Sequence, residues 1–123
     1  MPEPTLRDCR ILVVEDEYML ADDLTNELVD AQAIVIGPVA TVGAALELLA
    51  AEQQLDGAIL DVNLCGEMVF PVADQLLDRR VPFLFSTGYD GSIIPPRFAH
   101  VVRCEKPIDM KRVTLAIGRV VHS

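Results

Sequence analysis

The feature of this chain that most constrains its fold is the alternation of short apolar runs with longer amphipathic segments. The apolar runs are rich in β-branched and aromatic residues and span residues 11–14, 33–36, 57–61, 82–85 and 100–104. Between the first two runs, Leu20, Leu24 and Leu28 recur every four residues among acidic neighbours, which predicts a helix over 18–31. Strands that alternate with helices in this way indicate βαβ units and a parallel sheet.

The remaining segments complete the predicted order. Thr41 is a suitable N-cap for a second helix, Pro71 fits the first turn of a third, and residues 109–121 have the apolar spacing of a last helix. We expect the second strand to stop at 37–38, a Gly-Pro pair, and any helix within 90–100 to be short or irregular because prolines 95 and 96 interrupt it. The fold class predicted is α/β, a flavodoxin-like, doubly wound, five-stranded parallel sheet with strand order 2-1-3-4-5.

Size and charge limit the organisation and the function. The 123 residues, 51% of them hydrophobic, suit a single domain over 1–123 with a core of about 8–121, and we expect no output domain. A net charge of −9 argues against nonspecific binding to nucleic acid or to an anionic membrane. No signal peptide or bilayer-length apolar run is evident, and an odd number of cysteines without CxxC spacing favours reduced thiols. We therefore expect a cytoplasmic protein.

Polar residues end four of the five predicted strands. The first strand runs into Glu15 and Asp16, the third into Asp61, the fourth into Thr87 and the fifth into Lys106. Each residue alone also fits a helix cap, a turn or a surface loop. Right-handed crossovers, however, bring the carboxyl ends of parallel strands to one edge of the sheet, where a crevice forms. The joint placement therefore predicts one site.

The three carboxylates of this predicted site need a cation. Two carboxylates about 5 Å apart repel by roughly 3 kcal/mol at an effective dielectric constant of about 20. Lysine relieves part of this repulsion, and a hard divalent cation such as Mg²⁺ or Mn²⁺ relieves more. With a metal, a hydroxyl and an ammonium beside it, Asp61 has the surroundings of a carboxylate that accepts a phosphoryl group.

At this point the sequence resembles the receiver domain of two-component response regulators over nearly its whole length. The matching motifs are Val13-Val14-Glu15-Asp16-Glu17, Leu60-Asp61-Val62-Asn63, Ser86-Thr87-Gly88 and Lys106-Pro107. The resemblance implies that Asp61 is the phospho-acceptor and that Thr87 and Lys106 contact the phosphoryl group. It also implies that Asp16 binds the metal directly, Glu15 through water and Asn63 through its backbone carbonyl, and that the Lys106-Pro107 bond is cis.

Three positions depart from the family pattern. Arg103 replaces the usual aromatic residue of the last strand, and Cys65 replaces the usual proline after the acceptor loop. The stretch from 85 to 89 resembles a receiver subgroup that reads Phe-Ala-Thr-Gly-apolar-Tyr, although Asp90 stands at the place of its final tyrosine. We expect Cys65 to be a small loop residue without special reactivity. Tyr89 and Arg103 are the candidates for transmitting the signal.

The function predicted is that of a stand-alone, phospho-accepting receiver in a phosphorelay, and not of an enzyme. Its partners would be a histidine kinase or a histidine phosphotransfer protein, and a downstream protein. The first alternative is a receiver-like interaction module that is not phosphorylated. The second is a phosphohydrolase with an aspartyl-phosphate intermediate; phosphatases of the haloacid-dehalogenase kind carry a second Asp where this chain has Asn63.

Overall fold

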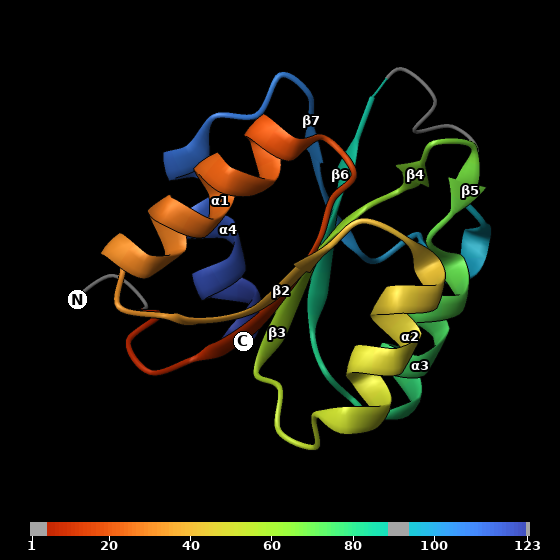
Figure 1. Cartoon of the computed structure of the whole chain (residues 1–123), viewed down its shortest axis with the longest axis horizontal. Coiled ribbons are helices and arrows are strands. Elements are labelled where there is room, and N and C mark those ends of the chain that lie inside the picture. Colours follow the sequence, from red (N-terminus) through yellow and green to blue (C-terminus); the bar gives the residue numbers. More distant parts are fainter. Residues whose placement is uncertain (1–4, 89–93, 123) are drawn as a thin grey trace.

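A computed structural model of the chain describes residues 5–88 and 94–122. Five parallel strands form the main sheet in the order β2-β1-β3-β6-β7 (Figure 1). They are β1 (Arg10–Val14), β2 (Ile34–Val39), β3 (Gly57–Asp61), β6 (Phe83–Thr87) and β7 (Val102–Glu105). A two-stranded antiparallel hairpin, β4 (Asn63–Leu64) and β5 (Glu67–Met68), follows β3. Apart from that hairpin, the order is the predicted 2-1-3-4-5, so the predicted fold class is confirmed.

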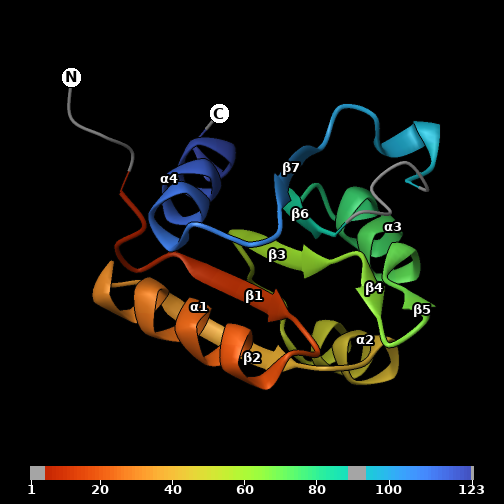
Figure 2. The same ribbon diagram turned by 90° about the horizontal axis from the view of Figure 1, so that it is seen from above.

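Helices cover both faces of this sheet. The helices are α1 (Tyr18–Asp30), α2 (Val42–Ala51), α3 (Phe70–Asp78) and α4 (Met110–Val121). Seen from above, α1 and α4 lie on one side of the strands and α2 and α3 on the other (Figure 2). Within the described residues, no helix is long and apolar enough to cross a bilayer.

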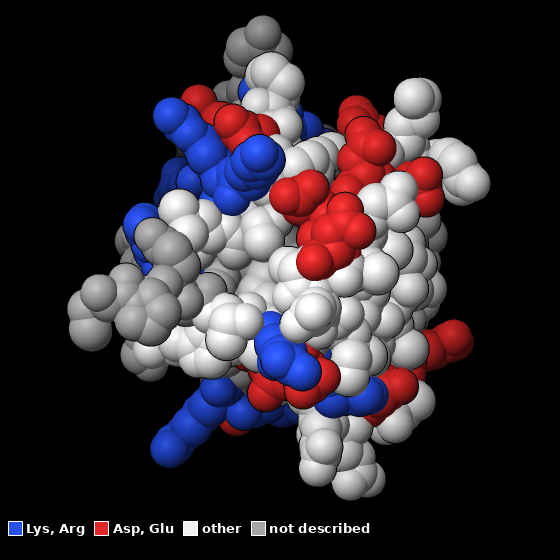
Figure 3. Space-filling view, turned by 90° about the vertical axis from the view of Figure 1, so that its left-hand side faces the viewer, with Lys and Arg blue, Asp and Glu red and all other residues white. Residues whose placement is uncertain are grey.

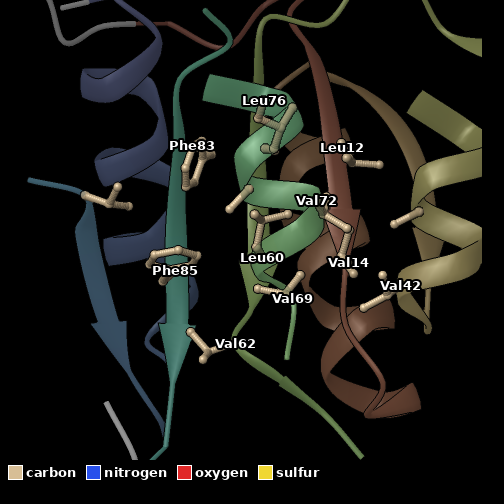
Figure 4. Packing of buried hydrophobic residues seen from close by; sticks show 14 of the residues in the cluster. Leu12, Val14, Val42, Leu60, Val62, Val69, Val72, Leu76, Phe83 and Phe85 are labelled. Carbon is tan, nitrogen blue, oxygen red and sulfur yellow. The ribbon is translucent and has the colours of Figure 1, made fainter. Parts of the chain in front are cut away.

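The two faces of the sheet make two separate cores because successive strand residues point to opposite faces. Leu12 and Val14 of β1 pack with α2 and α3, together with Leu60 of β3 and Phe85 of β6 (Figure 4). The alternate residue Val13 packs in the second cluster, which contains apolar residues of α1 and α4. The central strands are thus buried on both sides, which explains their nearly continuous apolar sequence.

Local sequence signals start the helices as expected. Thr41 Oγ1 accepts a hydrogen bond from the backbone N–H of Ala44 at 3.1 Å and caps α2. The Asp109 carboxylate accepts from the first N–H groups of α4, and Pro71 lies in the first turn of α3. Gly57 begins β3 at a point where α4 approaches the strand closely. A Cβ at this position would lie only 2.7 Å from Val121 Cγ2.

The second strand differs from the prediction. It does not stop at the Gly-Pro pair but continues to Val39, with the Gly37-Pro38 peptide bond cis and Gly37 at a φ of +99°. Since β2 is an edge strand, the missing N–H of the proline removes no ladder bond from a central pair. The continuation matters for the site because the Val39 carbonyl accepts from the Glu15 N–H at 2.9 Å.

The region after β6 agrees with the expectation of a short or irregular helix. Its described part contains one 3-10 turn, Pro96–Phe98, whose Phe98 is fully buried. The Phe98 ring packs edge-on against Phe85, with ring centroids 5.5 Å apart. The hairpin β4–β5, by contrast, is not among the predicted elements.

Charge is distributed unevenly over the surface. On the side where α1 and α4 lie, acidic side chains gather over α1 and basic side chains over the start of α4 (Figure 3). Asp22 and Asp23 are exposed on α1, and Lys111 and Arg112 are exposed on α4. The net charge of −9 therefore does not describe every part of the surface.

Candidate functional site

Asp61 is the last residue of β3 and only 3% exposed. One carboxylate oxygen, Oδ2, accepts from Lys106 Nζ at 3.1 Å, and the other, Oδ1, accepts from the backbone N–H of Asn63 at 3.3 Å. Burial raises the pKa of the Asp61 carboxyl, although the ammonium of Lys106 opposes this shift. Asp61 is thus a shielded carboxylate held in place by two donors.

Lys106 reaches the site from the end of β7. Its backbone N–H donates to the Thr87 carbonyl at 2.7 Å, which ties the end of β7 to the end of β6. Its ammonium lies between Asp61 and Glu15, 3.5 Å from Glu15 Oε1. Burial disfavours the charged ammonium, but the hydrogen bond to Asp61 and the neighbouring carboxylates outweigh burial and raise the pKa of Lys106. The Lys106-Pro107 bond is cis, as the resemblance implied.

Glu15 follows β1 and is also 3% exposed. Its Oε2 accepts from the backbone N–H of Glu17 at 3.0 Å, whereas Oε1 has no hydrogen-bond partner among the described residues. Burial, reinforced by the adjacent Asp61, raises the pKa of Glu15 to about 8. Without a bound cation, the Glu15 carboxyl is therefore protonated more readily than that of an exposed glutamate.

Asp16 occupies the outer side of the same cluster and is less buried. Its Oδ2 lies 2.9 Å from the Sγ of Cys65, which donates to it. Burial would raise the pKa of Asp16, but hydrogen bonds, first that from Cys65, lower it. The same contact raises the pKa of the Cys65 thiol. No sequence signal predicts this contact, because 49 residues separate the two side chains.

The three acidic residues fit a metal site. Glu15, Asp16 and Asp61 each offer one carboxylate oxygen, and these oxygens lie within 4.8 Å of one another. An all-oxygen set that includes Glu15 Oε1, a buried oxygen without a hydrogen bond among the described residues, suits a hard cation such as Mg²⁺ or Mn²⁺. The candidate site opens into a cavity of about 300 Å³, lined in part by Asp16, Asp61 and Lys106.

Asn63 and Thr87 line the same cavity. Thr87 ends β6 and is 2% exposed, so its side chain stands at the wall rather than on the surface. The Asn63 side chain accepts from the backbone N–H of Gly66 at 2.6 Å and is occupied by the turn. The metal-binding role of the Asn63 carbonyl stays a prediction.

Of the two candidates for transmitting the signal, only Arg103 lies within the described residues. Arg103 lies on β7 and is exposed. Tyr89 falls outside the described residues, as does Asp90, so a role for Tyr89 in signalling stays a prediction.

Fold and site together define the class. The carboxyl ends of β1, β3, β6 and β7 bring Glu15, Asp16, Asp61, Thr87 and Lys106 to one edge of a doubly wound parallel sheet. In open α/β sheets this edge is where ligands bind, so these residues form the candidate functional site of a doubly wound α/β domain.

Comparisons with known proteins identify the family. No family model and no curated protein sequence matches the chain. Among solved structures, SdrG from Sphingomonas melonis is 35% identical, with a TM-score of 0.79, over 94% of this chain and 98% of its own. SdrG in its BeF3-activated conformation, from Pseudomonas melonis, is 35% identical, with a TM-score of 0.75, over 98% and 99%.

A response regulator receiver protein from Sinorhizobium medicae shares the fold at 23% identity, with a TM-score of 0.77, over 97% of this chain and 98% of its own. Taken with the similarity to SdrG, this places the chain in the response regulator receiver family. The subgroup with the Phe-Ala-Thr-Gly-apolar-Tyr motif stays a prediction.

Proposed function

We propose that this receiver accepts a phosphoryl group on Asp61 from a phosphohistidine of a histidine kinase or a histidine phosphotransfer protein. In this step an Asp61 oxygen forms a bond to phosphorus, the phosphorus–nitrogen bond of the phosphohistidine breaks, and the imidazole leaves. The observation that carries the proposal is the surroundings of Asp61. Its carboxylate is buried, bound by Lys106 at 3.1 Å, and clustered with the oxygens of Glu15 and Asp16.

The neighbouring side chains would act on the charge of the phosphoryl group. The Lys106 ammonium and the Thr87 hydroxyl would neutralise or hydrogen-bond its equatorial oxygens; both residues line the cavity beside Asp61, which supports this role. Glu15, Asp16, Asp61 and the Asn63 carbonyl would hold Mg²⁺ or Mn²⁺. When bound, such a cation supplies positive charge that favours the approach of an anionic phosphoryl group to a carboxylate.

The relatives support this proposal. SdrG, at 35% identity, has a BeF3-activated conformation, and beryllofluoride has the shape and charge of a phosphoryl group. By this analogy, phosphorylation of Asp61 would change binding to a downstream protein in the cytoplasm. The chain would be a signalling switch in a phosphorelay and not an enzyme.

The test is incubation with a small phosphodonor and Mg²⁺, followed by mass measurement of the intact protein. We expect the mass of one phosphoryl group on the wild type and none on Asp61→Asn, with both proteins folded. Phosphorylation of Asp61→Asn at another residue would overturn the assignment. A folded wild type that gains no mass would instead favour the interaction module, and steady turnover of a phosphate ester would favour the phosphohydrolase.

A further inference from the structure

A cavity of about 830 Å³ lies at the end of the sheet opposite the acceptor site. Its walls come from the starts of β6 and β7 and from the carboxyl-terminal ends of α3 and α4. Because the strands are parallel, their starts lie at one edge of the sheet and the acceptor site at the other. The cavity shares no lining residue with the cavity beside Asp61, so it is separate from the site of the proposed function.

The wall of this cavity is largely apolar. Its lining includes the buried side chains of Val81, Phe83 and Val101. Leu77 and Val102 also line it and are 36% and 44% exposed, so water reaches part of the apolar wall. Covering such a surface with an apolar group is favourable by about 25 cal/mol per Å². The volume falls within the range of roughly 300–1,000 Å³ that is typical of small-molecule sites.

The rim of the cavity is basic, although the chain carries a net charge of −9. Arg80 follows the end of α3, Arg119 lies in the last turn of α4, and both are exposed. Neither guanidinium has an ion-pair partner among the described residues, and His100 is a third basic residue of the lining. None of the described residues that line the cavity is acidic. Basic residues at helix carboxyl ends favour the helix dipole, but the dipole does not account for an apolar cavity between them.

We propose that this cavity binds a small amphipathic anion, namely a carboxylate with an unbranched hydrocarbon chain. The chain would lie against the apolar wall and the carboxylate at the basic rim. Guanidinium groups suit a carboxylate because their N–H groups donate to both of its oxygens. The inference goes beyond the proposed function and does not depend on phosphorylation.

A small ligand fits this cavity better than a protein partner does. Among the described lining residues, Leu77 and Val102 are the large apolar side chains that are exposed. A stable protein interface buries roughly 800 Å² on each partner and has several such side chains at its centre. One hydrocarbon chain with a charged end, by contrast, matches a single apolar cavity with charge at its rim.

The experiment is a titration of the metal-free protein with decanoate, followed by NMR. We expect saturable shifts of the amide signals of residues 100–102 and 116–121, with one ligand per chain. Affinity should rise from hexanoate to octanoate to decanoate, by up to about fourfold for each added methylene. The neutral alcohol 1-decanol, which has the same chain length, should bind more weakly than decanoate, and acetate should give no saturable shift.

Arginine variants test the basic rim. Arg80→Gln combined with Arg119→Gln should weaken decanoate binding by about threefold to tenfold, while binding of 1-decanol should change little. Arg112→Gln is the matched control, because Arg112 is an exposed arginine near the other end of α4 and outside the cavity. Val102→Glu adds a negative charge at an exposed wall position and should also weaken decanoate binding. This second variant keeps the test available if the double variant fails to fold.

Wild-type protein whose cavity signals do not respond to decanoate would overturn the proposal, and so would an equal loss of affinity in Arg112→Gln. Equal affinity for decanoate and 1-decanol would indicate an uncharged occupant and would overturn the anionic ligand. Sedimentation that shows a dimer in the wild type but not in Val102→Glu would assign the cavity to a second copy of the chain and would also overturn the proposal.

Discussion

The ammonium of Lys106 bridges two buried carboxylates, at 3.1 Å from Asp61 Oδ2 and 3.5 Å from Glu15 Oε1. It is the cation nearest to the acceptor among the described residues. Removing it leaves the buried Asp61 carboxylate without its charged partner, which is more costly than the loss of a surface ion pair. Stability and phosphoryl transfer should therefore both depend on Lys106.

Lys106→Met should destabilise the metal-free domain at neutral pH by about 1–3 kcal/mol, because Asp61 loses its charged partner. The measurement is urea unfolding, combined with Asp61→Asn in a double-mutant cycle. We expect the cost of Lys106→Met to be smaller when Asp61 is already Asn. Equal costs in the two backgrounds would mean that the pair does not contribute to stability.

The raised pKa of Glu15 predicts how stability depends on pH. Folding moves this pKa from about 4.5 to about 8, so the folded state binds more protons than the unfolded chain between these values. The Glu15 contribution is therefore fully present below pH 4.5 and is lost as pH rises towards 8, with a slope of at most about 1.4 kcal/mol per pH unit. Chemical unfolding of the metal-free protein at several pH values between 4.5 and 8 measures this pH dependence of the unfolding free energy.

Glu15→Gln is the matched control for this pH effect. Glutamine keeps the shape and cannot titrate, so the difference in unfolding free energy between wild type and variant should change with pH in the same window. Saturating Mg²⁺ should also reduce the pH dependence, since the cation favours the ionised carboxylate. A difference that is constant between pH 5 and pH 8 would contradict the raised pKa.

Metal binding should depend on Asp16, which precedes the first helix, and not on the acidic residues of that helix. Asp16→Ala removes one oxygen of the clustered set and should weaken Mg²⁺ binding by at least about tenfold. Asp30→Ala, an exposed change at the far end of α1, should leave it nearly unchanged. Calorimetric titration compares the two, and equal affinities would contradict the proposed metal site.

Gly57 should not tolerate a side chain. An alanine Cβ there would lie 2.7 Å from Val121 Cγ2 and 3.4 Å from Ile117 Cδ1, so the Val121 side chain or α4 would have to shift. We expect Gly57→Ala to cost about 1–3 kcal/mol in unfolding experiments. Gly43→Ala is the control, because its Cβ would meet no atom within 4 Å and alanine favours the helix α2. A neutral Gly57→Ala would show that α4 adjusts freely.

The signalling prediction concerns the segment after β6. We expect the amide signals of residues 88, 94, 97 and 98 to shift in NMR spectra when beryllofluoride and Mg²⁺ are added, because Thr87 immediately precedes this segment. Tyr89→Ala should alter the response if the tyrosine transmits it. An unchanged response in Tyr89→Ala would make Tyr89 a bystander, and unchanged spectra in the wild type would contradict a switch in this segment.

The sequence by itself determined the fold class and the composition of the acceptor site. Its short β-branched runs and four-residue leucine spacing dictate strands and helices through local periodicity. Parallel pairing and right-handed crossovers then bring Glu15, Asp16, Asp61, Thr87 and Lys106 to one edge. These inferences needed only the order of the elements and the residues at their ends.

Tertiary structure alone decided three other features. The second strand passes through Gly37-Pro38 because it lies at the edge of the sheet, and no local signal tells an edge strand from a central one. The turn at Cys65 and Gly66 is set by pairing across the hairpin β4–β5. The contact of Cys65 with Asp16 joins residues 49 positions apart. It depends on the parallel pairing of β1 and β3, which places the segments that follow these two strands at the same edge of the sheet.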